Sequence, residues 1–312
     1  MTCLVTGGAG FIGSHLCDKL IDLGHEVVCI DNFLTGNKRN IVQLLKNKHF
    51  TFIEDDILNI GNHTIGADHI FHLASPASPR WYQRYPIETL LVNGYATYLL
   101  LEMAKAQKAK FLFASTSEIY GDPKEHPQKE SYWGNVNPVG VRSCYDEGKR
   151  YGEALTSSYV RTHAVDGRII RIFNTYGPRM DVDDGRVVSN FIYQTLTHKP
   201  LSVYGSGQQT RSFCYVSDMV EAIIKAGMNE GLKGEVINIG NPQEITINQL
   251  ADEIVQIIGT KGKFINTPLP QDDPTRRKPT IQKAKKLLSW KPQVSLHDGI
   301  KQTVNYFRKS YL

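Results

Sequence analysis

The sequence contains no run of about 18 apolar residues, the length that a helix needs to cross a bilayer, so we expect no membrane span. Met1 is followed almost at once by a strand pattern, which leaves no room for a signal peptide or for a membrane-anchoring leader. We therefore expect a cytoplasmic protein with no membrane partner.

Cysteine is scarce as well: five residues are scattered through the 312, without a Cys-x-x-Cys pair. This scatter is typical of buried, reduced thiols in a cytosolic protein, and we expect no metal site. The five are Cys3, Cys17, Cys29, Cys144 and Cys214.

Neither sign of charge is in large excess. The 36 Lys and Arg against 31 Asp and Glu give a net charge of +5, and no long basic block occurs. We therefore expect no nucleic-acid partner, while an anionic substrate would account for the mild positive charge. The length suits two domains, or one large α/β domain with a cap.

What the sequence does have is a glycine-rich turn in a strand–turn–helix setting. An apolar strand over 2–6 is followed by Gly7-Gly-Ala-Gly-Phe-Ile-Gly13 and a helical stretch running to about Leu23. A second strand over 26–30 ends in Asp31. This is the dinucleotide fingerprint: the glycines let the pyrophosphate approach the helix N-terminus, whose free amides favour negative charge.

Asp31 predicts which dinucleotide binds. It lies 18 residues after Gly13, where a carboxylate accepts hydrogen bonds from the adenosine ribose and repels a 2′-phosphate, so NAD is favoured over NADP. Lys38 and Arg39 could favour NADP, but we interpret them as solvated loop charges. After the third strand, Asp56 and Ile57 are positioned to hold adenine.

Strands and helices continue to alternate, with further strands predicted over 50–53, 68–73, 168–173 and 235–239. This pattern predicts a Rossmann-type, doubly wound parallel α/β sheet with a smaller mixed C-terminal substrate-binding domain. We assign residues 1–173, with 212–240 returning to them, to an NAD-binding domain. Residues 174–211 and 241–312 are then a nucleotide-sugar-binding domain.

Several later segments have their own patterns. Two prolines fix 74–79 as a loop, and Pro86 opens a long helix over 87–105 whose apolar residues cover more than one stripe. Such a helix covers the sheet with one side and is free to meet a second subunit with the other. Helices are also predicted over 216–226 and 246–258 and at the C-terminus, and four prolines make 267–279 an ordered or gating loop.

The segment from Ala114 to Lys149 carries the candidate catalytic groups. Tyr145 and Lys149 are four residues apart, so on a helix they share one face. A nearby ammonium stabilises a phenolate and lowers the tyrosine pKa from about 10 toward the range useful for a base. Thr116 follows an apolar run that would deliver it to the carboxyl edge of the sheet, where ligands of such sheets bind.

Together, the fingerprint, Thr116 and Tyr145-x-x-x-Lys149 resemble the extended short-chain dehydrogenase/reductase family over essentially the whole chain. Within it, the sequence is similar to the branch that decarboxylates UDP-glucuronate to UDP-xylose. Arg84-Tyr85 departs from the Tyr-Asn of many members. The stretches that match this branch are 72–79, 116–123, 132–138, 145–150, 171–179, 184–190 and 272–279.

The resemblance implies a redox-neutral decarboxylation. NAD would take hydride from C4 of the glucuronate while Tyr145, tuned by Lys149 and hydrogen-bonded through Thr116, takes the hydroxyl proton. The C4 ketone is β to the C6 carboxylate, so CO₂ can leave before NADH returns the hydride. Glu118 would orient the sugar or a water, and Arg277 would assist decarboxylation and the return of a proton to C5.

The same resemblance implies the remaining contacts. Substrate contacts are expected from Tyr82, Glu118, Asn174, Asn190, Tyr204, Arg211 and Arg277. Cofactor contacts are expected from Gly7, Gly10, Phe11, Ile12, Gly13, Asp31, Asn32, Asp56, Ile57, Leu73, Tyr145, Lys149, Thr175 and Arg186. A homodimer is also implied, in which the helix after Pro86 and the helix carrying Tyr145 pair with their copies as a four-helix bundle.

Other activities of the same fold stay open at this point. A nucleotide-sugar 4-epimerase needs the Thr, Tyr and Lys but neither Glu118 nor Arg277. A 4,6-dehydratase carries an Asp-Glu pair after the Thr, and here the Asp position is Ser117, which disfavours dehydration. A module that only binds or senses a dinucleotide commonly loses the Tyr or the Lys. Whether the substrate carries uridine or thymidine diphosphate is not decided by these residues.

Overall fold

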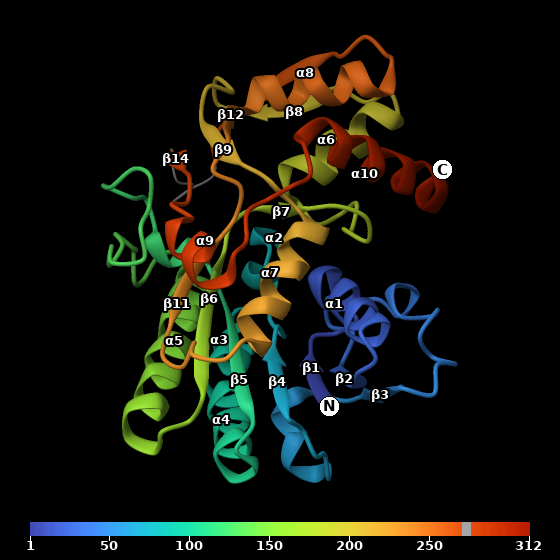
Figure 1. Cartoon of the computed structure of the whole chain (residues 1–312). Helices are drawn as coiled ribbons and strands as arrows, with labels where there is room; N and C mark the ends of the chain where they lie inside the picture. Colours follow the sequence, from blue (N-terminus) through green and yellow to red (C-terminus); the bar gives the residue numbers. More distant parts are fainter. Residues whose placement is uncertain (270–275) are drawn as a thin grey trace.

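A seven-stranded parallel sheet forms the centre of the protein, in a computed structural model that describes residues 1–269 and 276–312. Its strand order is β11-β6-β5-β4-β1-β2-β3, so the chain winds outward from β1 in both directions (Figure 1). The prediction of a doubly wound sheet is confirmed, including the return of the strand near 235–239. The strands are β1 Thr2–Thr6, β2 Glu26–Asp31, β3 Phe50–Glu54, β4 His69–His72, β5 Lys110–Thr116, β6 Gly167–Ile172 and β11 Val236–Ile239.

Helices cover both faces of the sheet. On one face, α1 (Phe11–Asp22) and α7 (Val216–Met228) pack against each other; on the other lie α4 (Tyr95–Gln107) and α5 (Ser143–His163). Glycines seat two of these helices directly on the strands. A Cβ at Gly152 of α5 would lie 2.3 Å from the Phe113 ring, and one at Gly227 of α7 would lie 2.2 Å from the Phe71 ring. The two helices can therefore approach the sheet more closely than any side chain would allow.

The helix expected over 87–105 is interrupted. It forms as α3 (Pro86–Asn93) and α4, with Gly94 between them, although hydrogen bonds from Gly94 N to Leu90 O and from Tyr98 N to Gly94 O continue the run. A Cβ at Gly94 would lie 2.9 Å from the Tyr151 ring of α5. The break therefore lies where a side chain would meet α5. The second proline of the expected 74–79 loop opens a further helix, α2 (Pro79–Arg84), that the sequence pattern did not predict.

The C-terminal elements lie beyond the carboxyl edge of the sheet (Figure 1). Helices α6, α8 and α10 pack together there, beside small sheets that pair β8 with β13, β7 with β10, and β9 with β12 and β14. Their bounds are α6 Val187–Leu196, α8 Ile247–Ile258, α9 Gln282–Leu288, α10 Leu296–Tyr311, β7 Thr175–Tyr176, β8 Leu201–Tyr204, β9 Thr210–Ser212, β10 Cys214–Tyr215, β12 Glu244–Thr246, β13 Phe264–Thr267 and β14 Arg276–Arg277. Short 3₁₀ helices are η1 Lys38–Asn40, η2 Ile57–Asn62 and η3 Ser117–Tyr120.

The segment predicted as an ordered or gating loop, 267–279, begins with the last residue of β13, Thr267, and contains β14, which includes Arg277. The prediction that Arg277 lies in a loop is therefore wrong. A two-residue strand between prolines carries no periodicity that could reveal it in the sequence. Asp272, Asp273 and Pro274, which contributed to the motif at 272–279, lie outside the described residues.

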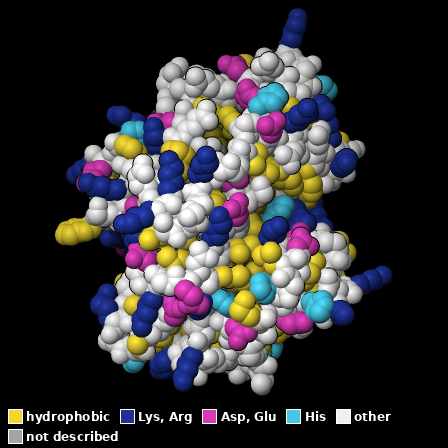
Figure 2. Space-filling view, in the orientation of Figure 1, with side chains coloured by type: hydrophobic (Ala, Val, Ile, Leu, Met, Phe, Trp, Pro, Cys, Tyr) yellow, Lys and Arg dark blue, Asp and Glu magenta, His cyan; other side chains and the backbone are white. Residues whose placement is uncertain are grey.

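Charged side chains of both signs lie on the surface of the protein. Figure 2 shows Lys and Arg side chains spread over the drawn face, with Asp and Glu between them. Within residues 1–269 and 276–312, no helix is long and apolar enough to cross a membrane.

Candidate active site

The glycine-rich turn forms an open cradle at the start of α1. Gly7 has a φ of +72°, and a Cβ there would lie 2.7 Å from the Ala74 backbone. A Cβ at Gly13 would lie 2.2 Å from the Gly7 carbonyl oxygen. Gly10 occupies the N-cap of α1, so no side chain covers the free amides of the first turn. These residues fit a pyrophosphate, which would accept hydrogen bonds from those amides.

Asp31 faces the same turn from the end of β2. Its carboxylate accepts hydrogen bonds from Ala9 N (3.0 Å) and Phe33 N (2.8 Å), and a Cβ at Gly36 would lie 2.6 Å from it. Burial raises the pKa of Asp31 above its ordinary value, and the two backbone bonds partly oppose that rise. The carboxylate is thus fixed where a ribose diol would meet it, in the position that the sequence predicts for NAD selection.

Two connected cavities open from this turn across the carboxyl edge of the sheet. The first, of about 270 Å³, extends from the glycine-rich turn to the segment carrying Thr116. The second, of about 370 Å³, continues beneath α6 and β9. They share a wall that contains the residues Glu118, Asn174, Thr175, Met180, Arg186 and Arg277.

The cavities bring together nearly all of the residues that the sequence predicts. Every expected cofactor contact lines the first cavity, as do Thr116, Glu118 and Arg277. Six of the seven expected substrate contacts line the second: Glu118, Asn174, Asn190, Tyr204, Arg211 and Arg277. The remaining expected substrate contact, Tyr82, is not among the described residues that line the two cavities. Its ring is buried and stacks on Tyr145, with ring centroids 5.0 Å apart and planes 6° apart.

The candidate base, Tyr145, lines the first cavity. Tyr145 lies in the first turn of α5, buried, and its hydroxyl shares a hydrogen bond with the Thr116 hydroxyl. Thr116 is the last residue of β5, and its side chain also accepts a hydrogen bond from Glu118 N. The expected pairing of Thr116 with Tyr145 is therefore present in the geometry.

Lys149 lies one turn beyond Tyr145 but does not have the expected effect on its pKa. The Nζ atom donates to Ala114 O at 2.7 Å and lies 5.8 Å from the Tyr145 ring centroid. Burial lowers the pKa of Lys149 to about 7. The pKa of Tyr145 is raised, first by burial and then by the Glu118 carboxylate. The protein groups alone thus keep Tyr145 protonated, and a positive charge brought near its oxygen would be needed to release the proton.

Glu118 lies between two arginines. Arg142 Nη2 donates to Glu118 Oε2 at 2.6 Å, and Arg277 Nη1 lies 3.7 Å from Glu118 Oε1. Burial alone would raise the pKa of Glu118, but Arg142 and Arg277 outweigh it and hold the pKa below its ordinary value. Glu118 is therefore an anion whose two oxygens are held by different elements.

Two residues of this cluster were missed by the sequence-based prediction. Arg142 caps α5 and lines the second cavity, and the Asp146 carboxyl shares a hydrogen bond with Glu118. Burial, then Glu118, raises the pKa of Asp146 to about 8, and its Oδ1 has no hydrogen-bond partner among the described residues. Both residues are close to Tyr145 in sequence. Their contact with Glu118 could not be predicted, because it depends on how η3, which carries Glu118, packs against the start of α5.

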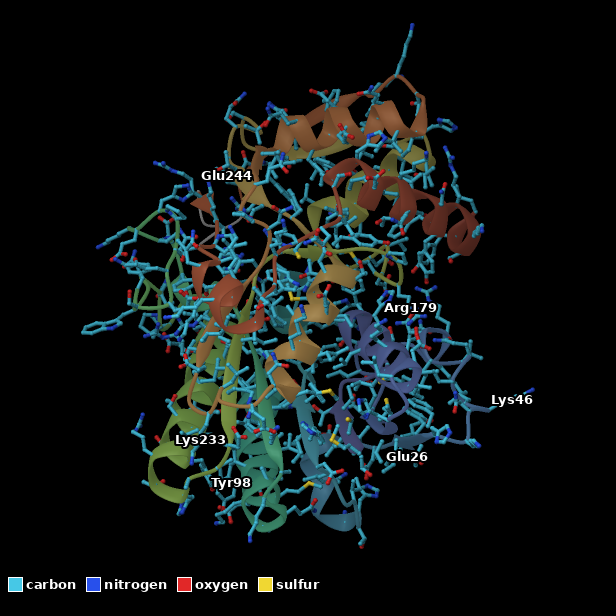
Figure 3. All side chains as sticks on the ribbon, in the orientation of Figure 1. Glu26, Lys46, Tyr98, Arg179, Lys233 and Glu244 are labelled. Atoms are coloured by element: carbon cyan, nitrogen blue, oxygen red, sulfur yellow. The ribbon has the colours of Figure 1, made fainter. Side chains whose placement is uncertain are left out.

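The second cavity is rich in arginine. Arg186 donates to Ala77 O at 2.6 Å and pairs with Asp184, which holds it across the shared wall. Near it, Arg179 pairs with Asp18 of α1 at 2.6 Å, at the junction of the C-terminal elements with the sheet (Figure 3). Such a density of guanidinium groups suits an anionic ligand with several oxygens, such as a diphosphate. The arginines that line this cavity are Arg80, Arg142, Arg186, Arg211 and Arg277.

Comparison with known sequences places this site among nucleotide-sugar enzymes. The NAD dependent epimerase/dehydratase family matches residues 3–240. UDP-glucuronic acid decarboxylase 1 of Xenopus tropicalis is 52% identical over 306 residues, 98% of this chain and 72% of that protein. UDP-glucuronic acid decarboxylase 3 of Arabidopsis thaliana is 50% identical over 309 residues, 99% of this chain and 89% of that protein.

Solved structures agree with the fold and extend the range of chemistries. The UDP-glucuronic acid 4-epimerase of Bacillus cereus, in complex with UDP-glucuronic acid and NAD, has a TM-score of 0.89 at 33% identity, and each chain covers all of the other. The dTDP-glucose 4,6-dehydratase of Streptomyces venezuelae, with NAD bound, has a TM-score of 0.91 at 27% identity, covering 99% of this chain and 98% of that one.

Proposed function

Because the chain belongs to the NAD dependent epimerase/dehydratase family, the extended short-chain dehydrogenases/reductases, we propose that it converts UDP-glucuronate to UDP-xylose and CO₂ with bound NAD. About half of its residues are identical to those of the UDP-glucuronic acid decarboxylases, over nearly its whole length. The observation that carries the proposal is the placement of Glu118 and Arg277 on the wall shared by the two cavities, next to Tyr145.

The first step oxidises C4 of the sugar to a ketone, removing a hydride from C4 and a proton from its hydroxyl group. Tyr145 accepts the proton of the C4 hydroxyl, and Thr116 orients the Tyr145 hydroxyl through the hydrogen bond that they share. NAD, when bound, supplies the hydride acceptor for this step and the hydride donor for the last one. Lys149 Nζ is held by Ala114 O, 5.8 Å from the Tyr145 ring centroid, and burial lowers its pKa to about 7, so it adds positive charge near the phenolate only while it is protonated. The further positive charge that Tyr145 needs to release its proton would come with bound NAD.

The second step breaks the C5–C6 bond. The C4 ketone is β to the C6 carboxylate, so the bonding electrons move onto the C4 oxygen as CO₂ leaves. Tyr145, now protonated, and Thr116 donate hydrogen bonds to that oxygen. Arg277 adds positive charge where the carboxylate and then the enolate lie, while Glu118 holds the guanidinium in place.

The third step returns a proton to C5 and a hydride to C4. Each turnover consumes one proton, because a carboxylate is replaced by a C–H bond and neutral CO₂. Glu118 and Asp146 share a hydrogen bond next to Arg277, so a protonated carboxyl group lies close to where that proton is needed. Tyr145 gives up its proton to the C4 oxygen as the sugar is reduced.

We further propose how the ligands divide between the two parts of the chain. Residues 1–173 with 212–240 would bind NAD, since they provide most of the first cavity. Residues 174–211 with 241–312 would bind the nucleotide diphosphate, since Asn190, Tyr204 and Arg211 line the second cavity. The sugar would then span the shared wall.

Related reactions require different groups at this wall. A 4-epimerase rotates a C4 ketone and has no carboxylate to release, so it gains nothing from an arginine pressed against Glu118. A 4,6-dehydratase needs an acid for the leaving hydroxyl, and the position after Thr116 is Ser117. Asp146 brings a second carboxyl group to Glu118, but from α5 rather than from the Thr116 segment.

Incubation with UDP-glucuronate labelled at C6 tests the proposal directly. We expect labelled CO₂ and a UDP-pentose, with no net change in NADH, because the hydride removed from C4 is returned to it. Mass analysis of the nucleotide sugar and collection of the released gas measure both products. Retention of all carbons as UDP-galacturonate would replace the decarboxylase by an epimerase.

We also propose a homodimer in which the exposed sides of α3, α4 and α5 pair with a second copy. Apolar side chains are exposed there on α3, α4 and α5, and Tyr98 lies at the far end of the molecule from the C-terminal elements (Figure 3). Pairing with a second copy would cover them in the four-helix arrangement expected from the sequence. The exposed residues are Ile87, Leu90, Leu91, Tyr95, Tyr98 and Tyr151.

Charge placed on this surface should separate the copies. Ile87→Glu combined with Leu90→Glu buries two carboxylates in the proposed interface, so light scattering at micromolar concentration should report a monomer where the unaltered protein is a dimer. Val42→Glu is the matched control, because Val42 is as exposed (59%) as Ile87 (62%) and lies on a different surface. A monomeric unaltered protein would refute the dimer.

For the cellular location we propose the cytoplasm. All five cysteines are buried and carry free thiols, which suits a reducing compartment. Fractionation of cells that produce the protein would test this, and its recovery from an oxidising compartment would contradict it.

A further inference from the structure

Gln128 clamps the strand that carries Arg277. It is fully buried in the segment between η3 and α5, and both its backbone and its side chain bond to residues that follow Arg277. Gln128 N donates to Lys278 O at 2.8 Å, and Lys278 N donates to Gln128 Oε1 at 2.8 Å. Thr280 N and Thr280 Oγ1 both donate to Gln128 O, at 2.8 and 3.0 Å. One residue thus makes four hydrogen bonds to the chain just beyond Arg277.

Within residues 1–269 and 276–312, the other hydrogen bonds to the β14 backbone come from β9, so the clamp adds a second support to the strand. The strand is two residues long and pairs with β9, where Arg277 lies opposite Arg211. Ser212 Oγ adds a bond of 3.4 Å to Arg277 O. The bonds from Gln128 hold the chain immediately after the strand. They therefore fix the backbone at Arg277 and, with it, the direction in which the Arg277 side chain points.

Gln128 is itself anchored to β11, the edge strand of the central sheet. Its Nε2 donates to Glu125 O at 2.7 Å, and its carbonyl oxygen accepts from Asn238 Nδ2 of β11 at 3.2 Å. Tyr120 Oη donates to Asn238 Oδ1 at 2.8 Å. Tyr120 is two residues after Glu118, so the same set of bonds reaches the carboxylate with which Arg277 pairs.

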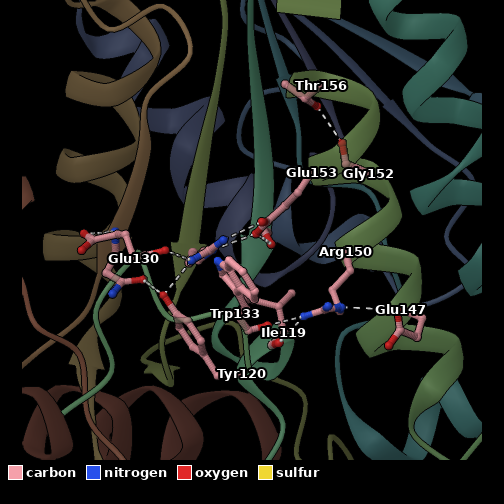
Figure 4. Close-up of polar contacts among 12 residues, drawn as sticks. Ile119, Tyr120, Glu130, Trp133, Glu147, Arg150, Gly152, Glu153 and Thr156 are labelled. Carbon is pink, nitrogen blue, oxygen red and sulfur yellow. Dashed lines mark hydrogen bonds and ion pairs between the residues drawn. The ribbon is translucent and has the colours of Figure 1, made fainter. Parts of the chain in front are cut away.

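The anchor continues to the helix of the candidate base. Figure 4 shows Glu153, Tyr120 and Glu130 converging on one guanidinium, which is that of Arg171. Glu153 lies on α5 one turn beyond Lys149, and it accepts a further bond of 2.6 Å from Ser115 Oγ. The backbone segments that present the tyrosine, the threonine, the glutamate and the arginine are therefore tied to one buried set of polar groups.

We propose that Gln128 is a positioning residue for Arg277: it sets the distance between the guanidinium and Glu118 on the shared wall, and so acts on carbon–carbon bond cleavage. The role rests on the proposed decarboxylation. Arg277 Nη1 and Glu118 Oε1 are 3.7 Å apart, and a displacement of about 1 Å at a charge-stabilising group can cost up to ~10²-fold in rate. The oxidation at C4 depends on Tyr145 and Thr116, whereas the hydrogen bonds of Gln128 to described residues go to Glu125, Asn238, Lys278 and Thr280.

The test uses Gln128→Met, which keeps the volume of the buried side chain but removes its two hydrogen bonds. Hydride transfer from C4 is followed by the transient absorbance of NADH, and cleavage by released CO₂. We expect CO₂ release to fall by about 10- to 100-fold while hydride transfer stays within about 2-fold of the unaltered protein. Equal loss in both steps would overturn the proposal. Gln107→Ala is the control: its side chain also bonds two backbone groups (Ala67 N and Ile65 O, each at 2.8 Å), far from the site.

A double-mutant cycle separates positioning from general loss of structure. If Gln128 acts through Arg277, then Gln128→Met should have little further effect once Arg277→Ala is present, and additive effects would refute the coupling. The cycle is measured both for CO₂ release and for the affinity for UDP-glucuronate. If the unaltered protein released no CO₂, the proposed function would fail, and the coupling would still be read from the affinities.

Discussion

Tyr145→Phe should slow hydride transfer from C4 by about 10²–10⁴-fold, the usual cost of losing a general base. The substitution removes one oxygen and leaves the ring, which is buried and stacked on Tyr82, in its place. NAD and UDP-glucuronate should therefore still bind. Rapid mixing of the NAD-loaded protein with UDP-glucuronate measures the rate at which NADH appears, and equilibrium binding of both ligands verifies that the pocket is intact.

The control for this variant is Tyr159→Phe on the same helix. Tyr159 donates its hydroxyl hydrogen to Glu102 at 2.5 Å on the surface of α4, far from both cavities. The Tyr159→Phe variant should retain the normal rate, because it lacks one hydroxyl group but keeps Tyr145, the proton acceptor of the reaction. If Tyr145→Phe turned over as fast as Tyr159→Phe, Tyr145 would have no part in the proton transfer.

Arg277→Ala should have its largest effect on the cleavage step. We expect CO₂ release to fall by about 10²–10³-fold, the range for removing one preorganised group that stabilises developing charge. The first hydride transfer should persist, since Tyr145, Thr116 and Lys149 keep their contacts, and Glu118 keeps its bond to Arg142. Accumulation of NADH with a 4-keto sugar that retains its carboxylate would be the signature, measured by absorbance and by mass.

The neighbouring Arg276 provides a matched control. It lies in the same two-residue strand and is exposed, whereas Arg277 is buried against Glu118. Arg276→Ala removes the same amount of charge from the same place in the chain and should leave CO₂ release unchanged. Equal losses in the two variants would mean that net charge, and not the contact with Glu118, is what the reaction needs.

Local patterns predicted much of the fold and the cofactor-facing part of the site. The strand, the glycine-rich turn and the helix of residues 2–23 follow from near-neighbour rules, and Asp31 follows from its spacing after Gly13. The doubly wound parallel sheet follows from alternation of strands and helices. The structure brings each predicted cofactor residue to one cavity, because a parallel sheet places all its carboxyl ends along one edge.

What local patterns could not predict depends on contacts between distant segments. Arg142 and Asp146 belong to the site because they contact Glu118, which is more than twenty residues earlier in the chain. The expected lowering of the Tyr145 pKa by Lys149 assumed only their spacing, whereas burial and Glu118 decide it. The interruption at Gly94 reflects the ring of Tyr151, and β14 exists only because β9 lies beside it.

The contact between Asp146 and Glu118 makes folding itself a proton-binding reaction. Burial and Glu118 raise the pKa of Asp146 to about 8, so between the ordinary pKa of an aspartate and pH 8 the folded chain holds a proton that the unfolded chain has lost. The free energy of unfolding therefore falls as the pH rises across that window. Glu118 has the opposite sign: its lowered pKa adds stability above the ordinary pKa of a glutamate, and that stability is lost as the solution becomes more acidic. Mildly acidic solution, where one proton is shared by two carboxyl groups, is where this pair favours the native state most.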